Sequence, residues 1–330
     1  VADNTFKLET QKIGDVDVTQ YTANKMNIYG GLRMGGKAIY GLNIINPAKP
    51  TLLFQINNTT TGFDRLSQVW SKPTLADIRV AGVRQKVLIF GGGYDESIYE
   101  KDGTAFTEPT TATKGNALYI VNANTGVLIK SISSSSTGAT GDQAEVKYSV
   151  VGQPVVLDYD SDGLADMIYF ADLGGQMFRV DLNNAAQSTT VSPPDVMVRV
   201  KRISNLKETN FVPRFYDRLT AAVFDKGQDR FVLVTGGSGN RSYPLASAIQ
   251  RNKIYGILDY NAATNGLEKS SFTAFDAVAT SSNLANRGVL GRASSTLLWG
   301  AGSITDDQLK TAMAPNGTLR GWRFDLLSSQ

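Results

Sequence analysis

The sequence contains no cysteine and no histidine among its 330 residues. The absence of cysteine excludes disulfide bonds, thiolate metal sites and a cysteine nucleophile. The absence of histidine excludes a Ser-His-Asp arrangement and a histidine general base. Only carboxylate, lysine, tyrosine and hydroxyl groups remain for side-chain chemistry, so any metal must be a hard cation that accepts oxygen ligands.

Charge is also scarce, at 19% of residues, with 33 Lys and Arg against 30 Asp and Glu and a net charge of +3. No run of basic residues is long enough to form a nucleic-acid stripe, so we expect no nucleic-acid partner. The apolar runs have the length of strands, well below the ~18 residues of a membrane helix, so we expect no membrane span. No signal peptide is visible and the chain begins at Val1, which indicates a processed product or an excised fragment.

Glycine, in contrast, is abundant, with 32 residues, and much of it lies in an internal repeat. In each repeat a short apolar run ends near paired glycines, and an aromatic-centred segment with alternating apolar residues follows it. The glycine-ended runs are residues 27–31, 87–92, 167–175, 231–237 and 297–302, and the aromatic segments are residues 37–43, 116–122, 176–181, 253–259 and 319–325. Opening strands precede the glycines at residues 72–76, 153–157 and 292–295, and a fourth strand is visible at residues 124–130.

Five repeats of about four short strands each predict an all-β protein of the β-propeller class, with four-stranded blades and a single domain over residues 1–330. The alternative is a β-sandwich whose hairpins are similar by accident. Insertions fall at one point of the repeat, in residues 94–114, 240–252 and 303–318, so we expect them to gather on one face of the disc. Helix signals are sparse, and residues 306–313 are the best candidate.

Residues 158–166 carry the clearest chemical signal, a D-x-D-x-D-G-x-x-D pattern typical of a Ca²⁺ loop. Four carboxylates would supply oxygen ligands, the glycine would permit the sharp turn, and a backbone carbonyl at the seventh position would add a further oxygen. Without a cation, four negative charges within nine residues would repel one another. The predicted ligands are Asp158, Asp160, Asp162, Leu164 through its carbonyl, and Asp166.

The loop departs from an EF-hand because the twelfth position is Tyr169 and the flanking residues 155–157 and 167–170 predict strands. We therefore expect the ion to lie in a hairpin loop within one blade, in a structural or regulatory role and without a catalytic one. A solvated acidic turn with no ion is the alternative.

With these residues in place, the chain resembles the C-terminal β-propeller of the PilY/PilC family of type IV pilus tip proteins. The resemblance extends over residues 27–326, and its most specific part is the calcium loop with the segment that follows it. The matching segments are residues 35–43, 67–73, 152–155, 169–182 and 320–326.

The resemblance implies a modified seven-bladed, quinoprotein-like propeller at the C-terminus of a longer secreted protein. Since only five repeats are visible, the rest of the ring would be short, degenerate or supplied by residues 1–26 and the insertions. It also implies a place on the bacterial cell surface, at the pilus tip or outer membrane, with minor pilins and a host or abiotic surface ligand as partners. The implied roles are pilus assembly, control of extension and retraction, adhesion, twitching motility and virulence, with Ca²⁺ on the loop ligands named above.

Two other functions remain open at this point. One is a calcium-dependent lectin or host-receptor-binding propeller unrelated to pili. The other is a quinoprotein dehydrogenase, since residues 116–130 are similar to that repeat, although Ile129 stands where its tryptophan is expected. The protein is not expected to be an enzyme, because the residues that most enzymes of this size use are missing. No Arg-Gly-Asp sequence is present to support integrin recognition.

Overall fold

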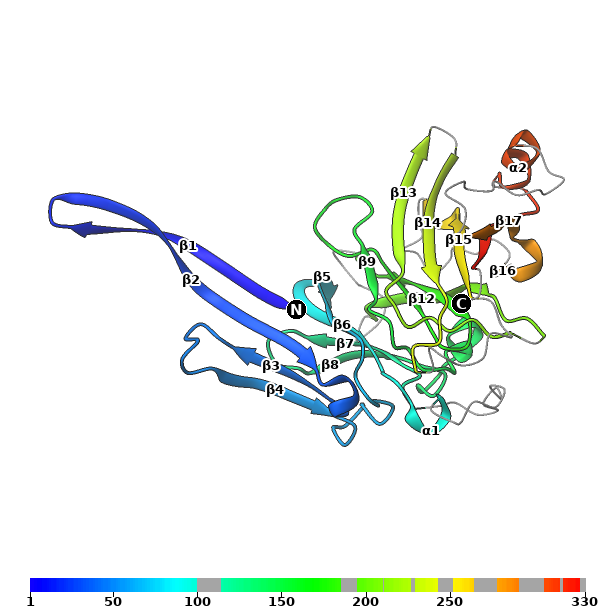
Figure 1. The fold of residues 1–330 in the computed structure, drawn as a ribbon. Coiled ribbons are helices and arrows are strands. Elements are labelled where there is room, and N and C mark those ends of the chain that lie inside the picture. Colours follow the sequence, from blue (N-terminus) through cyan, green and yellow to red (C-terminus); the bar gives the residue numbers. More distant parts are fainter. Residues whose placement is uncertain are drawn as a thin grey trace.

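The structure is a computed structural model that describes residues 1–99, 114–184, 195–209, 211–226, 229–242, 252–263, 278–290, 306–314 and 317–326. Nearly all regular structure in these residues is β-strand, arranged in four sheets (Figure 1). The helices are α1 (Glu96–Tyr99) and α2 (Asp306–Ala312), with 3-10 turns at Arg33–Gly35, Gly141–Glu145, Asn261–Ala263 and Ser281–Asn283. In the described part of the chain, no helix is both long and apolar enough to span a membrane.

The first two sheets are antiparallel meanders of four strands, in which each strand pairs with the next along the chain. The first sheet comprises β1 (Ala2–Ile13), β2 (Val16–Gly31), β3 (Ala38–Asn43) and β4 (Thr51–Asn57). The second comprises β5 (Thr74–Val80), β6 (Val83–Gly91), β7 (Leu118–Asn122) and β8 (Leu128–Ile132).

The third and fourth sheets have five strands, of which four are antiparallel and the fifth is a parallel edge strand. The third sheet comprises β9 (Val155–Leu157), β10 (Met167–Ala171), β11 (Gln176–Leu182), β12 (Met197–Asn205) and β16 (Ala279–Thr280). The fourth comprises β13 (Thr220–Lys226), β14 (Asp229–Gly237), β15 (Lys253–Asp259), β18 (Gly321–Leu326) and β17 (Ala285–Leu290).

Three buried clusters fill the spaces between successive sheets. In β6, Val87 and Ile89 pack toward the third sheet while Leu88 and Phe90 pack toward the first, because neighbouring side chains of a strand point to opposite faces. A third cluster joins the third sheet to the fourth. Sheets that bury both faces need continuous apolar runs, which explains why these strands are not amphipathic. Four-stranded sheets packed face to face in succession are the blades of a β-propeller, as the sequence predicts.

One expectation about the repeats was wrong, and one of the open sources for further blades is excluded. The fifth aromatic segment does not belong to a blade of its own, because β18 pairs with β15 and so completes the fourth sheet. Residues 1–26 also supply no extra blade, since they pair as a hairpin that lengthens the first sheet. The described residues thus form four sheets.

The expected helix at residues 306–313 is confirmed by α2. Most of the expected insertions, at residues 100–113, 243–251 and 303–305, lie outside the described residues, as do the fifth glycine-ended run and its opening strand.

Candidate metal centre

The acidic loop connects two short strands of the third blade. Strands β9 and β10 pair in antiparallel register, with Leu157 opposite Met167, and the Asp166 N–H donates to the Leu157 carbonyl at 2.9 Å. The loop is therefore closed at its base by the sheet, as the flanking sequence predicts. Two of its residues have positive φ angles, Ser161 at 63° and Gly163 at 84°, so the chain reverses sharply inside the loop.

The carboxylates fix the loop by accepting hydrogen bonds from its own backbone. Asp158 Oδ2 accepts from the Gly163 N–H at 2.9 Å, and Asp166 Oδ2 accepts from the Tyr159 N–H at 2.6 Å. Asp160 Oδ1 accepts from the Asp162 N–H at 3.1 Å. These bonds turn acidic side chains that are far apart in an extended chain toward the interior of one loop.

Three of the predicted ligands come together. Asp158, Asp160 and Asp166 each place one carboxylate oxygen so that all three atoms lie within 4.8 Å of one another. Ligand oxygens around Ca²⁺ lie about 2.3–2.6 Å from the ion, so this separation suits a shared cation. Asp158 Oδ1 is buried and has no hydrogen-bond partner among the residues that the structure describes, which leaves a lone pair for an ion to satisfy.

The remaining predicted ligands are placed differently. Asp162 lies outside the three-carboxylate cluster, and its Oδ1 accepts the Leu164 N–H at 2.7 Å. The Leu164 side chain is buried, which anchors this end of the loop. Burial raises the pKa of Asp166 above its ordinary value, and the nearby Asp160 carboxylate contributes in the same direction. This arrangement suits a positive charge between the carboxylates.

Sequence reasoning missed the residues that hold the loop from outside. Asn184 donates to Asp166 Oδ1 at 3.1 Å and to the Ala165 carbonyl at 2.6 Å. From the second blade, Arg84 Nη2 donates to the Gly163 carbonyl at 2.9 Å, and the Asp77 carbonyl accepts the Ala165 N–H at 2.8 Å. No local pattern marks these positions, because each acts across a long sequence separation.

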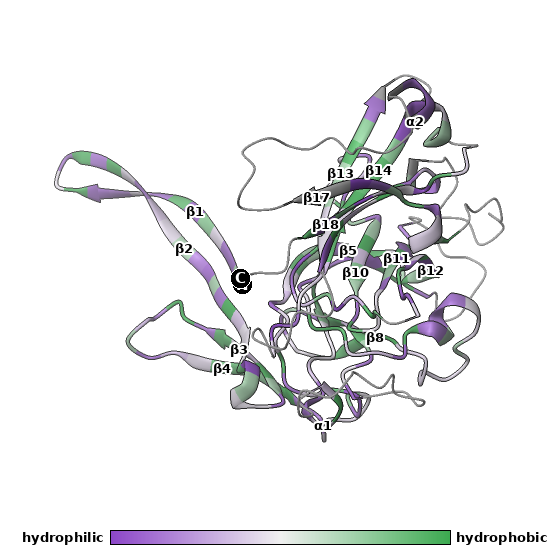
Figure 2. Ribbon diagram, turned by 45° about the vertical axis from the view of Figure 1, so that its right-hand side comes forward, coloured by the Kyte–Doolittle hydropathy of each residue, from purple (hydrophilic) through white to green (hydrophobic). Residues whose placement is uncertain are grey.

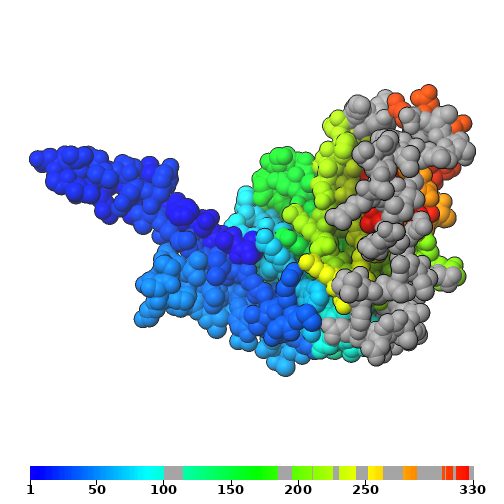
Figure 3. Space-filling view, in the orientation of Figure 1, coloured from blue at the N-terminus to red at the C-terminus, as the bar shows by residue number. Residues whose placement is uncertain are grey.

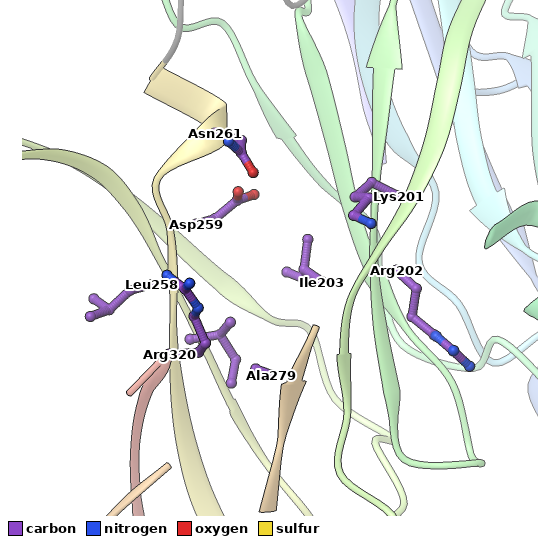
Figure 4. A pocket seen from close by; sticks show the side chains of 9 residues that line it. Lys201, Arg202, Ile203, Leu258, Asp259, Asn261, Ala279 and Arg320 are labelled. Carbon is purple, nitrogen blue, oxygen red and sulfur yellow. The ribbon is translucent and has the colours of Figure 1, made fainter. Parts of the chain in front are cut away.

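A second polar feature lies between the third and fourth blades. A cavity of about 20 Å³ has room for about one water molecule. It is lined by residues of β12, β15 and β16 and by Asn261 and Arg320. Asp259 and Asn261 face it from one side and Lys201 from the other, while Arg202 points away (Figure 4). This space is too small for an organic substrate.

The architecture defines a β-propeller with an acidic loop in its third blade. Residues 9–208 match the family described as the PilY1 beta-propeller domain. The chain belongs to this family.

Curated relatives and a solved structure are similar to the chain. The PilY1 homolog of Xylella fastidiosa is 29% identical over 162 residues, which cover 47% of the chain and 10% of that protein. PilY1 of Pseudomonas aeruginosa strain PAO1, a type IV pilus biogenesis factor, is 30% identical over 158 residues, covering 47% of the chain and 11% of that protein. The matched region is thus about a tenth of the length of these relatives.

The crystal structure of the Pseudomonas aeruginosa PilY1 C-terminal domain superimposes on the chain with a TM-score of 0.60 and 17% sequence identity. The similarity covers 97% of the chain and 62% of that structure. At this level of identity the match supports the propeller fold.

Proposed function

We propose that the chain is a calcium-binding, non-catalytic propeller that acts in type IV pilus biogenesis on the bacterial surface. Membership of the PilY1 propeller family supports the biological setting, and the three converging carboxylates support the cation. The proposed setting includes the pilus tip, minor pilins as partners, and roles in extension and retraction, adhesion, twitching motility and virulence.

Asp158, Asp160 and Asp166 would hold the ion, with Asp162 and the Leu164 carbonyl as the further sequence-predicted ligands. A bound Ca²⁺ would supply positive charge that offsets the repulsion between carboxylates. The loop residues would then keep their conformation, and Arg84 would keep its contact with the Gly163 carbonyl. Occupancy of the site would in this way influence how the second and third blades are joined.

Isothermal titration calorimetry with CaCl₂ tests the metal site. The wild-type protein should give a saturable heat with one ion per chain, and Asp160→Ala should abolish it. Asp217→Ala, an exposed acidic residue outside the loop, is the matched control and should bind like the wild type. Equal heats for the wild type and Asp160→Ala would contradict the proposal.

The biological role requires a separate measurement in the bacterium that carries the gene. Asp158→Ala in the chromosomal copy should reduce the number of surface pili or the twitching zone, with the protein present at its normal level. The Asp217→Ala strain should behave as the wild type. Unchanged pili and motility in a strain whose protein no longer binds calcium would show that pilus function does not depend on the metal site.

A further inference from the structure

The first blade carries an arm that projects away from the body of the protein (Figures 1 and 3). We define the arm as residues 2–26, the paired parts of β1 and β2 before β2 reaches β3. Nearly every residue from 4 to 21 is exposed, so both faces of this two-stranded ribbon meet solvent. An isolated two-stranded ribbon is at best marginally stable in water, which favours a partner for the arm.

Large apolar residues lie on this exposed ribbon, which is coloured green at several places along β1 and β2 in Figure 2. Phe6 and Leu8 share one face of β1, and Tyr21 stands directly opposite Leu8 on β2. These side chains are 51%, 60% and 77% exposed, respectively. Ile13 and Val16 face each other on the opposite side near the tip and are also exposed. Apolar groups gathered in this way indicate an interaction surface.

The outer edge of β1 is also open. Among the described residues, β1 pairs only with β2, so its other row of backbone N–H and C=O groups is available for pairing. Natural proteins usually protect a long edge strand with proline, with charged side chains or by covering it. β1 has twelve residues without proline, and its central charges, Lys7 and Glu9, are of opposite sign and pair with each other. The edge is therefore suited to receive another strand.

We propose that a second copy of this chain binds the arm, by antiparallel pairing of β1 with β1 around a two-fold axis at Leu8. The sequence of β1 is self-complementary in this register. Lys7 would stand opposite Glu9 of the second copy, and Glu9 opposite its Lys7, which gives two favourable cross-strand pairs. In one chain these two residues already form an ion pair along the strand, so their charges lie on the same face.

The same register joins the apolar groups of both copies. Leu8 would face Leu8, with Tyr21 outside it on each side, because Tyr21 is the partner of Leu8 within the arm. The result is a four-stranded sheet with a continuous row of four apolar side chains. Phe6 of each copy would lie beside this row. Three or more strands with an apolar face are more stable than a lone hairpin.

The charge of the arm favours a second copy of the chain, rather than a membrane surface, as its partner. The arm contains Lys7, Lys12 and Lys25 against four acidic residues, so it has no basic excess. Segments that bind anionic lipid surfaces are typically rich in Lys and Arg. A pairing of two strands is a small contact compared with a standard protein interface, so association should be weak and depend on protein concentration.

Sedimentation experiments over a range of concentrations test this association with the full chain. The average mass of the wild type should rise toward that of a dimer. Lys7→Glu places like charges opposite each other twice and should weaken association about tenfold, and Lys7→Glu with Glu9→Lys should restore it. Lys49→Glu changes the net charge equally, outside the arm, and should have no effect. A wild-type chain that stays monomeric, or a dimer insensitive to Lys7→Glu, overturns the proposal.

The absence of cysteine allows a direct test of the register. Leu8→Cys introduces a single thiol at the two-fold axis, where directly opposite Cβ atoms lie about 4.5–5.5 Å apart, so mild oxidation should give a disulfide-linked dimer. Thr10 is also exposed, but Thr10→Cys would stand opposite Phe6, with its own counterpart about four residues away. It should cross-link much more slowly. Equal cross-linking of the two variants, or none with Leu8→Cys, overturns the proposed pairing.

Discussion

Arg179 and Asp259 are 80 residues apart in sequence and form a buried ion pair between the third and fourth blades. Arg179 Nη1 lies 2.6 Å and 2.7 Å from the two carboxylate oxygens of Asp259. Arg179 Nε also donates to Asp181 at 2.7 Å, and the Tyr169 hydroxyl donates to Asp259 at 3.0 Å. Burial disfavours the charged guanidinium, but the two carboxylates outweigh it and hold the pKa of Arg179 above its usual value.

Removal of one partner of this pair should destabilise the protein strongly. Among the described residues, Asp259→Ala leaves Asp181 as the remaining counter-ion of the buried Arg179, so we expect a loss of about 3–5 kcal/mol in the free energy of unfolding. Urea denaturation followed by circular dichroism measures it. Arg230→Ala breaks the exposed pair with Asp225 and should change stability by less than ~0.5 kcal/mol. Similar small losses for both variants would contradict the structural importance of the buried pair.

The glycine repeats should differ in their tolerance of a side chain. A Cβ on Gly91 would lie 2.2 Å from the Val150 carbonyl oxygen, a backbone atom that cannot move aside easily. Gly91→Ala should therefore cost about 1–3 kcal/mol in the free energy of unfolding. Gly237 occupies an equivalent place in the fourth blade, and no atom of the described residues lies within 4 Å of such a Cβ. Gly237→Ala should be nearly neutral in the same assay, and equal losses would refute this account of the repeat.

These glycines show why the propeller could be predicted from the sequence. In the described blades each glycine-ended run is the second strand of its sheet, so the spacing of the glycines follows the spacing of the blades. Which strands pair with each other cannot be read from such a local pattern. Residues 321–326 have the pattern of a new blade, yet they pair with β15 because that strand offers the free edge.

The acidic loop could be recognised for a similar reason, since its four aspartates and its turn glycine lie within nine residues. The residues that hold the loop from outside could not be predicted in this way. Arg84 reaches the loop from the second blade, so its contact depends on how the second and third blades pack. Asn184 reaches it because the chain just after β11 lies beside Ala165. The arm was also missed, because the strand signal of residues 27–31 gave no indication that β2 begins at Val16.

Stability should depend on pH through Asp172. This side chain is fully buried, and burial raises its pKa to about 7, although it accepts hydrogen bonds from the backbone of Gly174 and Gln176. In the unfolded chain the group ionises near pH 4, so between about pH 4 and 7 the folded state binds more protons. The free energy of unfolding should therefore fall as pH rises through this window.

Asp172→Asn tests this dependence because it cannot ionise and its oxygen can still accept the two backbone hydrogen bonds. It loses the third bond, which the Gln176 Nε2 donates to Asp172 Oδ2 at 2.9 Å, so a constant loss of stability at every pH is expected besides the change in slope. Urea unfolding at pH 5, 6, 7 and 8 should give a shallower decline for the variant than for the wild type. The difference between the two curves removes contributions from other carboxyl groups. Parallel curves would show that Asp172 does not titrate in this range.

The loop geometry ranks the carboxylates as calcium ligands. Asp160 belongs to the three-oxygen cluster, whereas Asp162 lies outside it and already accepts a backbone hydrogen bond. Since affinity depends on the number of charged ligands, Asp160→Asn should weaken calcium binding by at least about tenfold, and Asp162→Asn should weaken it less.

Thermal unfolding with and without CaCl₂ measures this ranking through linkage. An ion at one hundred times its dissociation constant adds about 2.7 kcal/mol to the folded state, which should raise the wild-type Tm by several degrees. Asp160→Asn should lose most of this increase, Asp162→Asn should keep part of it, and Asp217→Asn should keep all of it. If Asp162→Asn proved as damaging as Asp160→Asn, the loop would have to rearrange around the ion to bring Asp162 into the coordination shell.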